Sequence, residues 1–234
     1  MGDFAKVIAL AAERRGGIDV LERALAETKS RTPAEIAATP DDRILAEMTR
    51  RIFNAGFSSK VIDSKWDGFE AAFDGFVPAR CAALSEERSD ALLKDSRIVR
   101  HGAKIQSVTA NAQFLLDVAA EHGSAAKFLA DWPDADYVGL LEILKKRGNR
   151  LGGDTGMRFL RAIGKPAFIP TGDVVAALIR EGVLTKAPGG KGDFKTMQQA
   201  FNRWSTETGR DLTEISRILA MSIGDVGHGR PGRH

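Results

Sequence analysis

The stretch LKKRGNRLGGDTGMRFL, residues 144–160, decides the fold because a helical pattern runs on both sides of a Gly-Gly pair. We expect one helix to end near Arg147 and a second to begin near Asp154 or Thr155, joined by a tight turn. Glycine lets the backbone adopt positive φ and lets a phosphate approach it, while the unpaired N–H groups of the second helix point at that phosphate. The stretch therefore predicts a helix-hairpin-helix in which Leu151 fills the space between the helices. An ordinary αα-hairpin with a Gly-rich turn remains the alternative.

Positive charge gathers around this turn. Residues 145–165 contain seven basic residues and only one acidic residue, Asp154, and this local surplus of six exceeds the net charge of +3 of the whole chain. Such a patch is typical of phosphate binding, although a solvated helix face would look the same. The residues that we expect to contact DNA are Lys146, Arg150, Leu151, Gly152, Gly153, Thr155, Gly156 and Arg158.

The rest of the chain also has a helical pattern. Apolar residues recur at three- and four-residue intervals, as in Ile105, Val108, Ala112 and Leu115, while alternating strand patterns are scarce. At 234 residues and 43% hydrophobic content, the chain can bury a sizeable core. We predict an all-α fold of about ten short helices in two lobes, with Thr32-Pro33 and Thr39-Pro40 opening helices with proline at the first helical position.

The expected organisation is a single unit, residues 1–234, with four parts. These are N-terminal helices (1–40), a helical body (41–138), the helix-hairpin-helix with a following helix (139–183) and C-terminal helices (194–224). The loop-rich stretch LTKAPGGKGD, residues 184–193, precedes the last part.

Composition excludes several classes of protein. The single cysteine, Cys81, cannot form an intramolecular disulfide, and the four histidines show no paired metal-ligand spacing. We therefore expect no metal and no cofactor. Apolar runs fall short of the roughly 18–20 residues of a membrane span, and the N-terminus lacks a signal-peptide cleavage site. The expectation is a soluble, cytoplasmic protein without a membrane partner.

A carboxylate follows the hairpin at a helix start. After the loop 164–172, Asp173 stands at the N-terminus of a new apolar-periodic helix. The helix dipole and the unpaired N–H groups there favour the ionised carboxylate. Considered alone, Asp173 would be an ordinary N-cap.

These features together resemble a known superfamily. The pattern L-x-G-x-x-G at residues 151–156, a second helix, a loop of about ten residues and then Asp173 is the order seen in helix-hairpin-helix DNA glycosylases. A narrower resemblance is to the DNA-3-methyladenine glycosylase I family. Three segments carry it: NAGFS (54–58) followed by Trp66, Phe69 and Phe73; IVRH (98–101) with Lys104-Ile105 and Asn111-Ala112; and LKKRG (144–148).

The sequence also departs from the pattern of that family. Arg51 stands where the family has a glutamate in the base pocket, and Ser59 stands where it usually has a tryptophan. The zinc ligands of the family have no counterpart here, which agrees with the expectation of no metal. If Arg51 faces the pocket, its charge would disfavour a cationic base.

The resemblance implies a base-excision repair enzyme whose partner is double-stranded DNA with a damaged base, acting as a monomer near the bacterial nucleoid. The base would be flipped out of the duplex, and Asp173 would stabilise the positive charge that develops on the sugar. The candidates for the base pocket are Phe53, Asn54, Phe57, Trp66 and Trp204, although large aromatic side chains are more often part of a core.

The position after the hairpin holds no lysine, since it reads Thr155-Gly156-Met157-Arg158. A strand-cutting glycosylase needs an amine there, so we expect water to be the nucleophile and a monofunctional enzyme acting on an alkylated purine. Two alternatives stay open: a non-catalytic helix-hairpin-helix DNA-binding protein, and a helical protein-interaction module.

Overall fold

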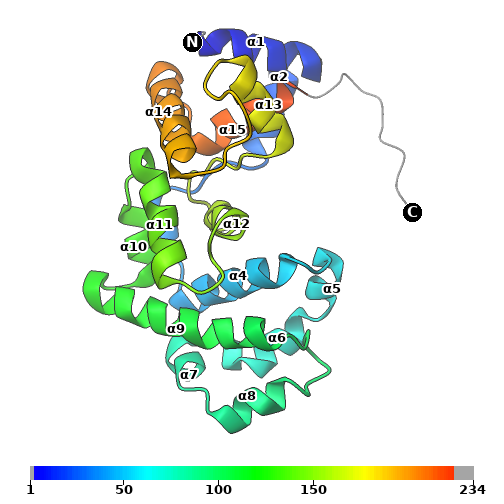
Figure 1. The fold of residues 1–234 in the computed structure, drawn as a ribbon, viewed down its shortest axis with the longest axis vertical. Helices are drawn as coiled ribbons and strands as arrows, with labels where there is room; N and C mark the ends of the chain where they lie inside the picture. The colour runs from blue at the N-terminus through cyan, green and yellow to red at the C-terminus, as the bar shows by residue number, and fades with distance from the viewer. Residues whose placement is uncertain (1–2, 224–234) are drawn as a thin grey trace. The chain divides into compact units, whose positions relative to one another are not determined.

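The computed structural model of the chain describes residues 3–223, and these residues form only helices and their connections (Figure 1). The predicted all-α fold is confirmed. The described residues contain fifteen α-helices and two 3-10 helices, where the sequence predicted about ten helices. The difference comes from helices of five to seven residues, in which the apolar period of 3.6 residues is repeated too few times to be recognised.

The chain divides into two compact units. Unit 1 combines the two ends of the chain, Met1–Ser30 and Pro166–His234, as far as they are described, and unit 2 is the continuous segment Arg31–Lys165. Arg31 and Gly164 lie together at the two ends of unit 2, because the Arg31 amide donates to the Gly164 carbonyl at 2.9 Å. Unit 2 therefore begins and ends at one place.

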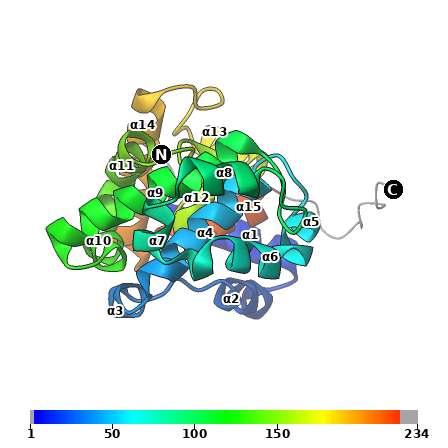
Figure 2. The ribbon, with the colours of Figure 1, turned by 90° about the horizontal axis from the view of Figure 1, so that it is seen from below.

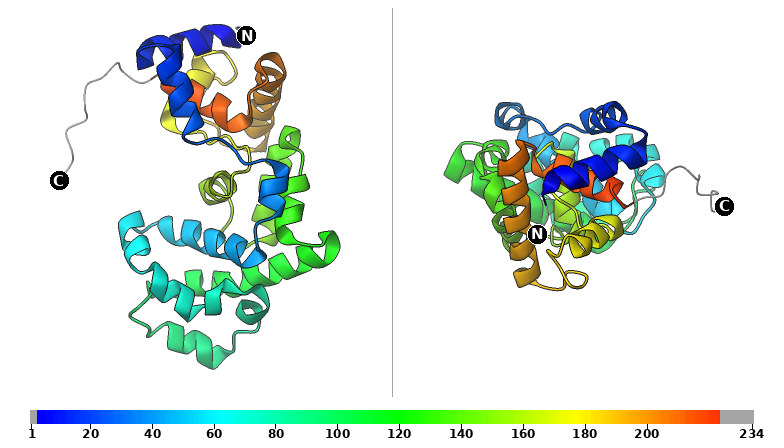
Figure 3. Two further views of the ribbon diagram at one scale, coloured as in Figure 1. Left: turned by 180° about the vertical axis from the view of Figure 1, so that it is seen from behind. Right: turned by 90° about the horizontal axis from the view of Figure 1, so that it is seen from above.

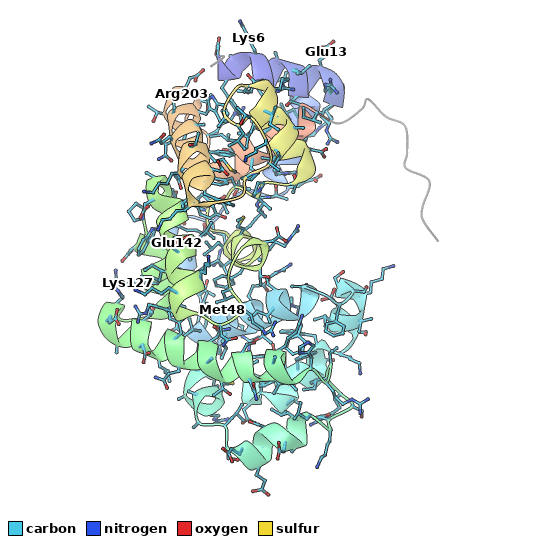
Figure 4. All side chains as sticks on the ribbon, viewed as in Figure 1. Lys6, Glu13, Met48, Lys127, Glu142 and Arg203 are labelled. Carbon is cyan, nitrogen blue, oxygen red and sulfur yellow. The ribbon has the colours of Figure 1, made fainter. Side chains whose placement is uncertain are left out.

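The described part of unit 1 contains five helices: α1 (Phe4–Arg15), α2 (Ile18–Ala26), α13 (Gly172–Arg180), α14 (Lys191–Thr208) and α15 (Leu212–Met221). The first helix of the chain packs against the last two (Figure 3). The ring of Phe4 lies 4.9 Å from that of Trp204, while Lys6 and Glu13 project outward from α1 (Figure 4). The apolar face of α1 is thus buried against residues about 200 positions away in the sequence.

Unit 2 contains ten α-helices and both 3-10 helices. They are α3 (Pro33–Ala37), α4 (Asp41–Asn54), α5 (Ser59–Ser64), α6 (Trp66–Ala72), η1 (Asp74–Phe76), α7 (Pro78–Ala82), α8 (Glu86–Leu92), α9 (Gly102–His122), α10 (Ala125–Asp131), η2 (Asp134–Asp136), α11 (Tyr137–Arg147) and α12 (Asp154–Ala162). The longest of them, α9, packs against α4, α7 and α10 (Figure 2). Unit 2 is therefore built around α9.

The two predicted Thr-Pro helix starts differ in detail. Thr32 caps α3 in a capping box with Glu35, and Pro33 is the first helical residue, as predicted. The second prediction is off by one residue, since Pro40 is itself the N-cap and α4 begins at Asp41. The Asp41 carboxylate accepts hydrogen bonds from the amides of Ala125 and Ala126 at the start of α10 and so links α4 to α10.

Among residues 3–223, none of the helices is long and apolar enough to cross a membrane. The histidines His228 and His234 lie outside the described residues.

Candidate functional site: the hairpin and the end of α4

The predicted hairpin is present in unit 2. Helix α11 ends at Arg147, and α12 begins at Asp154 with Gly153 as its N-cap. Gly153 has φ 59° and ψ −136°, a conformation that L side chains rarely adopt, and a Cβ added there would meet no atom within 4 Å. No protein atom therefore covers the outer side of Gly153. This residue stands at the N-terminus of the nine-residue helix α12, whose first N–H groups have no partner within the helix.

The inner side of the turn is tightly packed. Leu151 is only 1% exposed, and its carbonyl oxygen would lie 2.3 Å from a Cβ added to Gly156. A Cβ on Gly148 would lie 2.7 Å from the Leu151 side chain. The structure thus places Leu151 between the two helices, and Gly156 allows the close approach of α12 to the turn.

The side chain of Asn111, on α9, binds the backbone of the hairpin turn. Asn111, 1% exposed, donates its amide N–H to the Asn149 carbonyl at 3.0 Å, and its Oδ1 accepts from the Asn149 amide at 2.7 Å. Both backbone polar groups of one turn residue are therefore satisfied by one side chain. The only signal in the sequence is an asparagine among the apolar residues of a helix, and that signal does not identify the partner of the side chain.

The charge surplus around the turn is partly neutralised by ion pairs. Arg158 pairs with Asp154 one turn earlier on α12, Arg147 pairs with Glu121, and Lys165 pairs with Asp134. Lys146, Arg150, Gly152 and Gly153 are exposed on the hairpin, and Thr155 is half-buried. The predicted phosphate-binding residues are thus gathered on one turn and the helix ends beside it.

A second group of predicted residues lies at the C-terminal end of α4. Asn54 is the last residue of that helix, and its Oδ1 is buried without a hydrogen-bond partner. The half-buried ring of Phe57 meets the His101 ring edge-on, with 6.2 Å between the ring centres. His101 Nδ1 is also buried without a partner. Two unsatisfied polar atoms therefore flank this turn, which is uncommon in folded proteins.

Lys104 of α9 binds the end of α4 and was not among the predicted site residues. Its ammonium donates to the carbonyls of Ile52 and Ala55, both at 2.6 Å, and to that of Phe53 at 3.3 Å. The Lys104 side chain is buried, and its Nζ lies 5.0 Å from the centre of the Phe57 ring. Burial, with a smaller effect of the Arg150 charge, lowers the Lys104 pKa.

The other predicted pocket residues lie in aromatic clusters. Phe53 is fully buried and meets the Phe69 ring edge-on at 4.8 Å. Trp66 stacks on Phe69 at 5.5 Å, and the Arg50 guanidinium lies 3.9 Å from the Trp66 ring centre. Trp204 belongs to unit 1, where it is buried against Phe4. Of the five candidates, only Asn54 and Phe57 share one partly exposed turn.

Arg51 forms an ion pair with Glu47, one turn earlier on α4. Both side chains are partly buried. Arg51 occupies the position of the pocket glutamate of the DNA-3-methyladenine glycosylase I family. The negative charge of Glu47 beside it offsets the Arg51 charge.

Asp173 lies in the first turn of α13 in unit 1 and is exposed. The N-cap of α13 is Thr171, whose hydroxyl accepts from the Val174 amide at 3.5 Å, and Asp173 is the second helical residue. The interpretation of Asp173 as an ordinary N-cap is therefore wrong. Its carboxylate stays at the positive end of the helix dipole without serving as the cap.

Lys165, the lysine nearest after the hairpin, is buried at the end of unit 2. Its ammonium donates to the carbonyls of Ala130 at 3.2 Å and Trp132 at 2.5 Å, and it pairs with Asp134 at 2.9 Å. A lysine whose ammonium is bound by three oxygens is not available as a nucleophile. Among residues 3–223, no group of three or more His, Cys, Asp or Glu side chains could hold a metal ion.

Comparison with known proteins supports the resemblance drawn from the sequence. Residues 36–142 match the sequence model of the methyladenine glycosylase family. A curated relative, DNA-3-methyladenine glycosylase 1 of Escherichia coli (strain K12), is 36% identical over 64 residues, which are 27% of this chain. The matched part spans about a third of that relative, 34% of its length. The resemblance to DNA-3-methyladenine glycosylase I is confirmed over this part of the chain.

Solved structures of proteins with the same name are also similar. A variant of 3-methyladenine DNA glycosylase I in complex with 3-methyladenine is 25% identical, with 53% of this chain and 77% of that chain covered and a TM-score of 0.49. The Staphylococcus aureus enzyme, described by its recognition of 3-methyladenine, is 26% identical, with 53% and 76% covered and a TM-score of 0.48. The family match contains the end of α4 and all of α9, and it stops within α11 before the hairpin turn.

Proposed function

We propose that this chain, whose residues 36–142 match the methyladenine glycosylase family, is a monofunctional DNA glycosylase that removes a damaged base, an alkylated purine, from duplex DNA. Its partner in this proposal is double-stranded DNA that contains the lesion, and the protein acts as a monomer without a cofactor. The observation that carries the proposal is that one unit contains both an open hairpin turn and, at the end of α4, a turn with an aromatic ring and an unpaired amide oxygen.

The hairpin binds the DNA backbone in this proposal. A phosphate approaches Gly153, where no Cβ stands in the way, and accepts hydrogen bonds from the first N–H groups of α12. Lys146 and Arg150 are exposed on the same turn and supply positive charge. These contacts carry no sequence information, so they fix the position of the protein on any duplex.

The turn Asn54–Phe57 reads the flipped base. A buried amide oxygen without a partner costs free energy in the free protein, and a base edge with an N–H donor would satisfy it. The Phe57 ring offers a surface for stacking. The positive charge of Lys104 beside this turn disfavours a cationic base, so among alkylated purines we favour the neutral ones.

The carboxylate of Asp173 supports the chemistry. Water adds its oxygen to the sugar C1′, the C1′–N bond breaks, and the base leaves with the bonding electrons and takes up a proton. Asp173 stabilises the positive charge on the sugar and orients the water. The product is a free base and an abasic site.

A base-release assay on a panel of duplexes with alkylated or otherwise damaged bases tests this proposal. Asp173→Asn should lower the single-turnover rate of release by about a hundredfold or more, because the neutral amide cannot stabilise the sugar cation. The fold should be unchanged, since Thr171 caps α13. The matched control is Asp19→Asn, because Asp19 is also an exposed second residue of a helix in unit 1. Normal excision by a folded Asp173→Asn variant would eliminate this role.

The DNA strand should stay intact after base release. The lysine nearest after the hairpin, Lys165, is bound by three oxygens, so no described amine there is available for a Schiff base. Borohydride should therefore trap no covalent adduct, and strands should break only after added alkali. A trapped adduct that is lost in Lys165→Ala or Lys146→Ala would overturn the monofunctional assignment.

A second candidate function is a non-catalytic helix-hairpin-helix DNA-binding protein. The observation in its favour is Arg51, which replaces the pocket glutamate and is paired with Glu47. Under this alternative the wild-type chain binds duplex DNA with a strong salt dependence and releases no base from any duplex of the panel.

A further inference from the structure

Helix α9 carries three buried polar side chains on one face. Ser107 donates to the Lys104 carbonyl of its own helix, and the other two, Lys104 and Asn111, bond to other elements. They are seven residues apart, which is about two helical turns, so their Cα atoms are separated by roughly 10 Å along one side of the helix. Val108, between them on the same face, is fully buried, as expected for the core-facing side of α9. Buried polar side chains are rare on such a face unless a specific contact requires them.

Each of the two side chains is bound to the backbone of a turn rather than to another side chain. All three donors of the Lys104 ammonium have carbonyl acceptors at the end of α4 (Ile52, Phe53 and Ala55). The Asn111 amide uses one donor and one acceptor on Asn149 in the hairpin. Backbone contacts fix the path of the chain, whereas side-chain contacts could be lost through a rotamer change.

The two turns held in this way are the two to which we assign DNA contacts. We propose that α9 sets the spacing between the base-reading turn at residues 54–57 and the phosphate-binding turn at residues 148–153, with Lys104 and Asn111 as positioning residues. This inference rests on the proposed function. Neither side chain needs to touch DNA for it.

The physical reason is that a flipped base and its backbone phosphates are joined covalently. If the hairpin holds the phosphates, the base arrives at one fixed distance from them, and the reading turn must stand at that distance. A helix is stiff along its axis, and a packed interior transmits a displacement instead of absorbing it. An error of about 1 Å in such a placement can cost about a hundredfold in rate.

Asn111→Asp tests the spacing. The carboxylate keeps the acceptor for the Asn149 amide but loses the donor for the Asn149 carbonyl, so the turn should shift while α9 stays folded. We expect weaker binding of undamaged duplex and, at saturating DNA, a single-turnover rate of base release that is about ten- to a hundredfold lower. A side chain that served only phosphate affinity would change the binding constant and leave the saturating rate unchanged.

Lys104 provides the complementary measurement. Lys104→Met removes the donors to the end of α4, and we expect the saturating rate to fall while affinity for undamaged duplex is kept. If Lys104→Met does not fold, Lys104→Arg keeps the charge and the donors and should retain part of the rate. The control is Gln113→Ala, because Gln113 is exposed on α9 and bonds only Asp117 on the same helix.

The outcomes separate the two proposals. An unchanged saturating rate in Asn111→Asp, with an active wild-type chain, would overturn the spacing role of α9 and leave the proposed function standing. A wild-type chain that releases no base from any duplex would overturn the proposed function and the spacing role together. Reduced saturating rates in both Asn111→Asp and the Lys104 variant, with Gln113→Ala at the wild-type rate, would support the proposal.

Discussion

Arg158 is exposed beside the hairpin, but its guanidinium is paired with Asp154 on the same helix. Arg158→Ala should weaken binding of damaged and undamaged duplex alike and reduce the salt slope by about one unit. Asp154→Asn should do the opposite, because it frees Arg158 and removes a negative charge beside the phosphate site. Titrations with undamaged duplex at two salt concentrations check both changes. Equal affinities for the two variants would contradict the placement of the phosphate at this turn.

The residues of the hairpin were predictable from the sequence, whereas the contacts of the α9 side chains that bind the two turns were not. The roles of Gly153 and Leu151 can be predicted locally. A positive φ favours glycine at position 153, and the space between two adjacent helices favours a buried apolar side chain at position 151. Lys104 and Asn111 act across 38 or more positions of the chain, so their partners depend on how the helices pack. The ion pair of Lys165 with Asp134 is likewise a tertiary contact. It neutralises one of the seven positive charges in residues 145–165 with a carboxylate from outside that stretch.

At the scale of elements, α4 is tied to α6 and η1 by one arginine. The Arg43 guanidinium holds both oxygens of Glu70, at 2.7 and 3.0 Å, and also donates to the Gly75 carbonyl at 2.8 Å. Glu70 in addition accepts from the Trp66 indole at 3.0 Å. The Arg43 hydrogen bonds hold the pKa of the Glu70 carboxyl below its ordinary value.

Glu70→Gln should therefore lower stability at neutral pH by about 0.5–1 kcal/mol, a small value because the pair is partly exposed. A carboxyl with a lowered folded-state pKa stabilises the fold fully above its ordinary pKa and loses this effect as the pH falls through the folded value. Thermal unfolding of wild type and Glu70→Gln at pH 7 and below pH 4 measures the difference. A gap in Tm that stays constant down to the lowest pH would contradict the ionic contribution.

Helix boundaries were predicted where capping chemistry is local. Thr32-Pro33 and the Gly-Gly turn gave correct starts for α3 and α12. Helix α13 begins earlier than an N-cap at Asp173 would place it. Thr171 is the N-cap, and Asp173 lies in the first turn. The shift matters for function, since an aspartate that caps nothing is free to serve a substrate.

At the scale of the whole molecule, unit 2 is one uninterrupted segment whose ends are hydrogen-bonded to each other. A fragment of residues 31–165 should therefore fold alone, with a helical circular dichroism spectrum and a cooperative thermal transition. Residues 31–150 are the matched control, because this fragment lacks α12, which packs on α4. A fragment 31–165 without a cooperative transition would contradict the independence of unit 2.

The composition of unit 1 could not be read from the sequence. Periodicity identifies an apolar face on α1 or α14, but it carries no information about which distant helix covers that face. The Phe4–Trp204 contact joins residues from opposite ends of the chain, and only the folded arrangement identifies it.

This arrangement of unit 1 imposes an order on synthesis. Helices α1 and α2 are translated before unit 2, yet α14 and α15, which pack on α1, are translated after it. At ~5–20 residues per second, the 56 residues from Pro166 to the end of α15 at Met221 take about 3–11 s to translate. During that interval unit 2 can complete its fold while Phe4 still lacks the Trp204 ring. We therefore expect α1 to reach its native neighbours only after unit 2 has been translated.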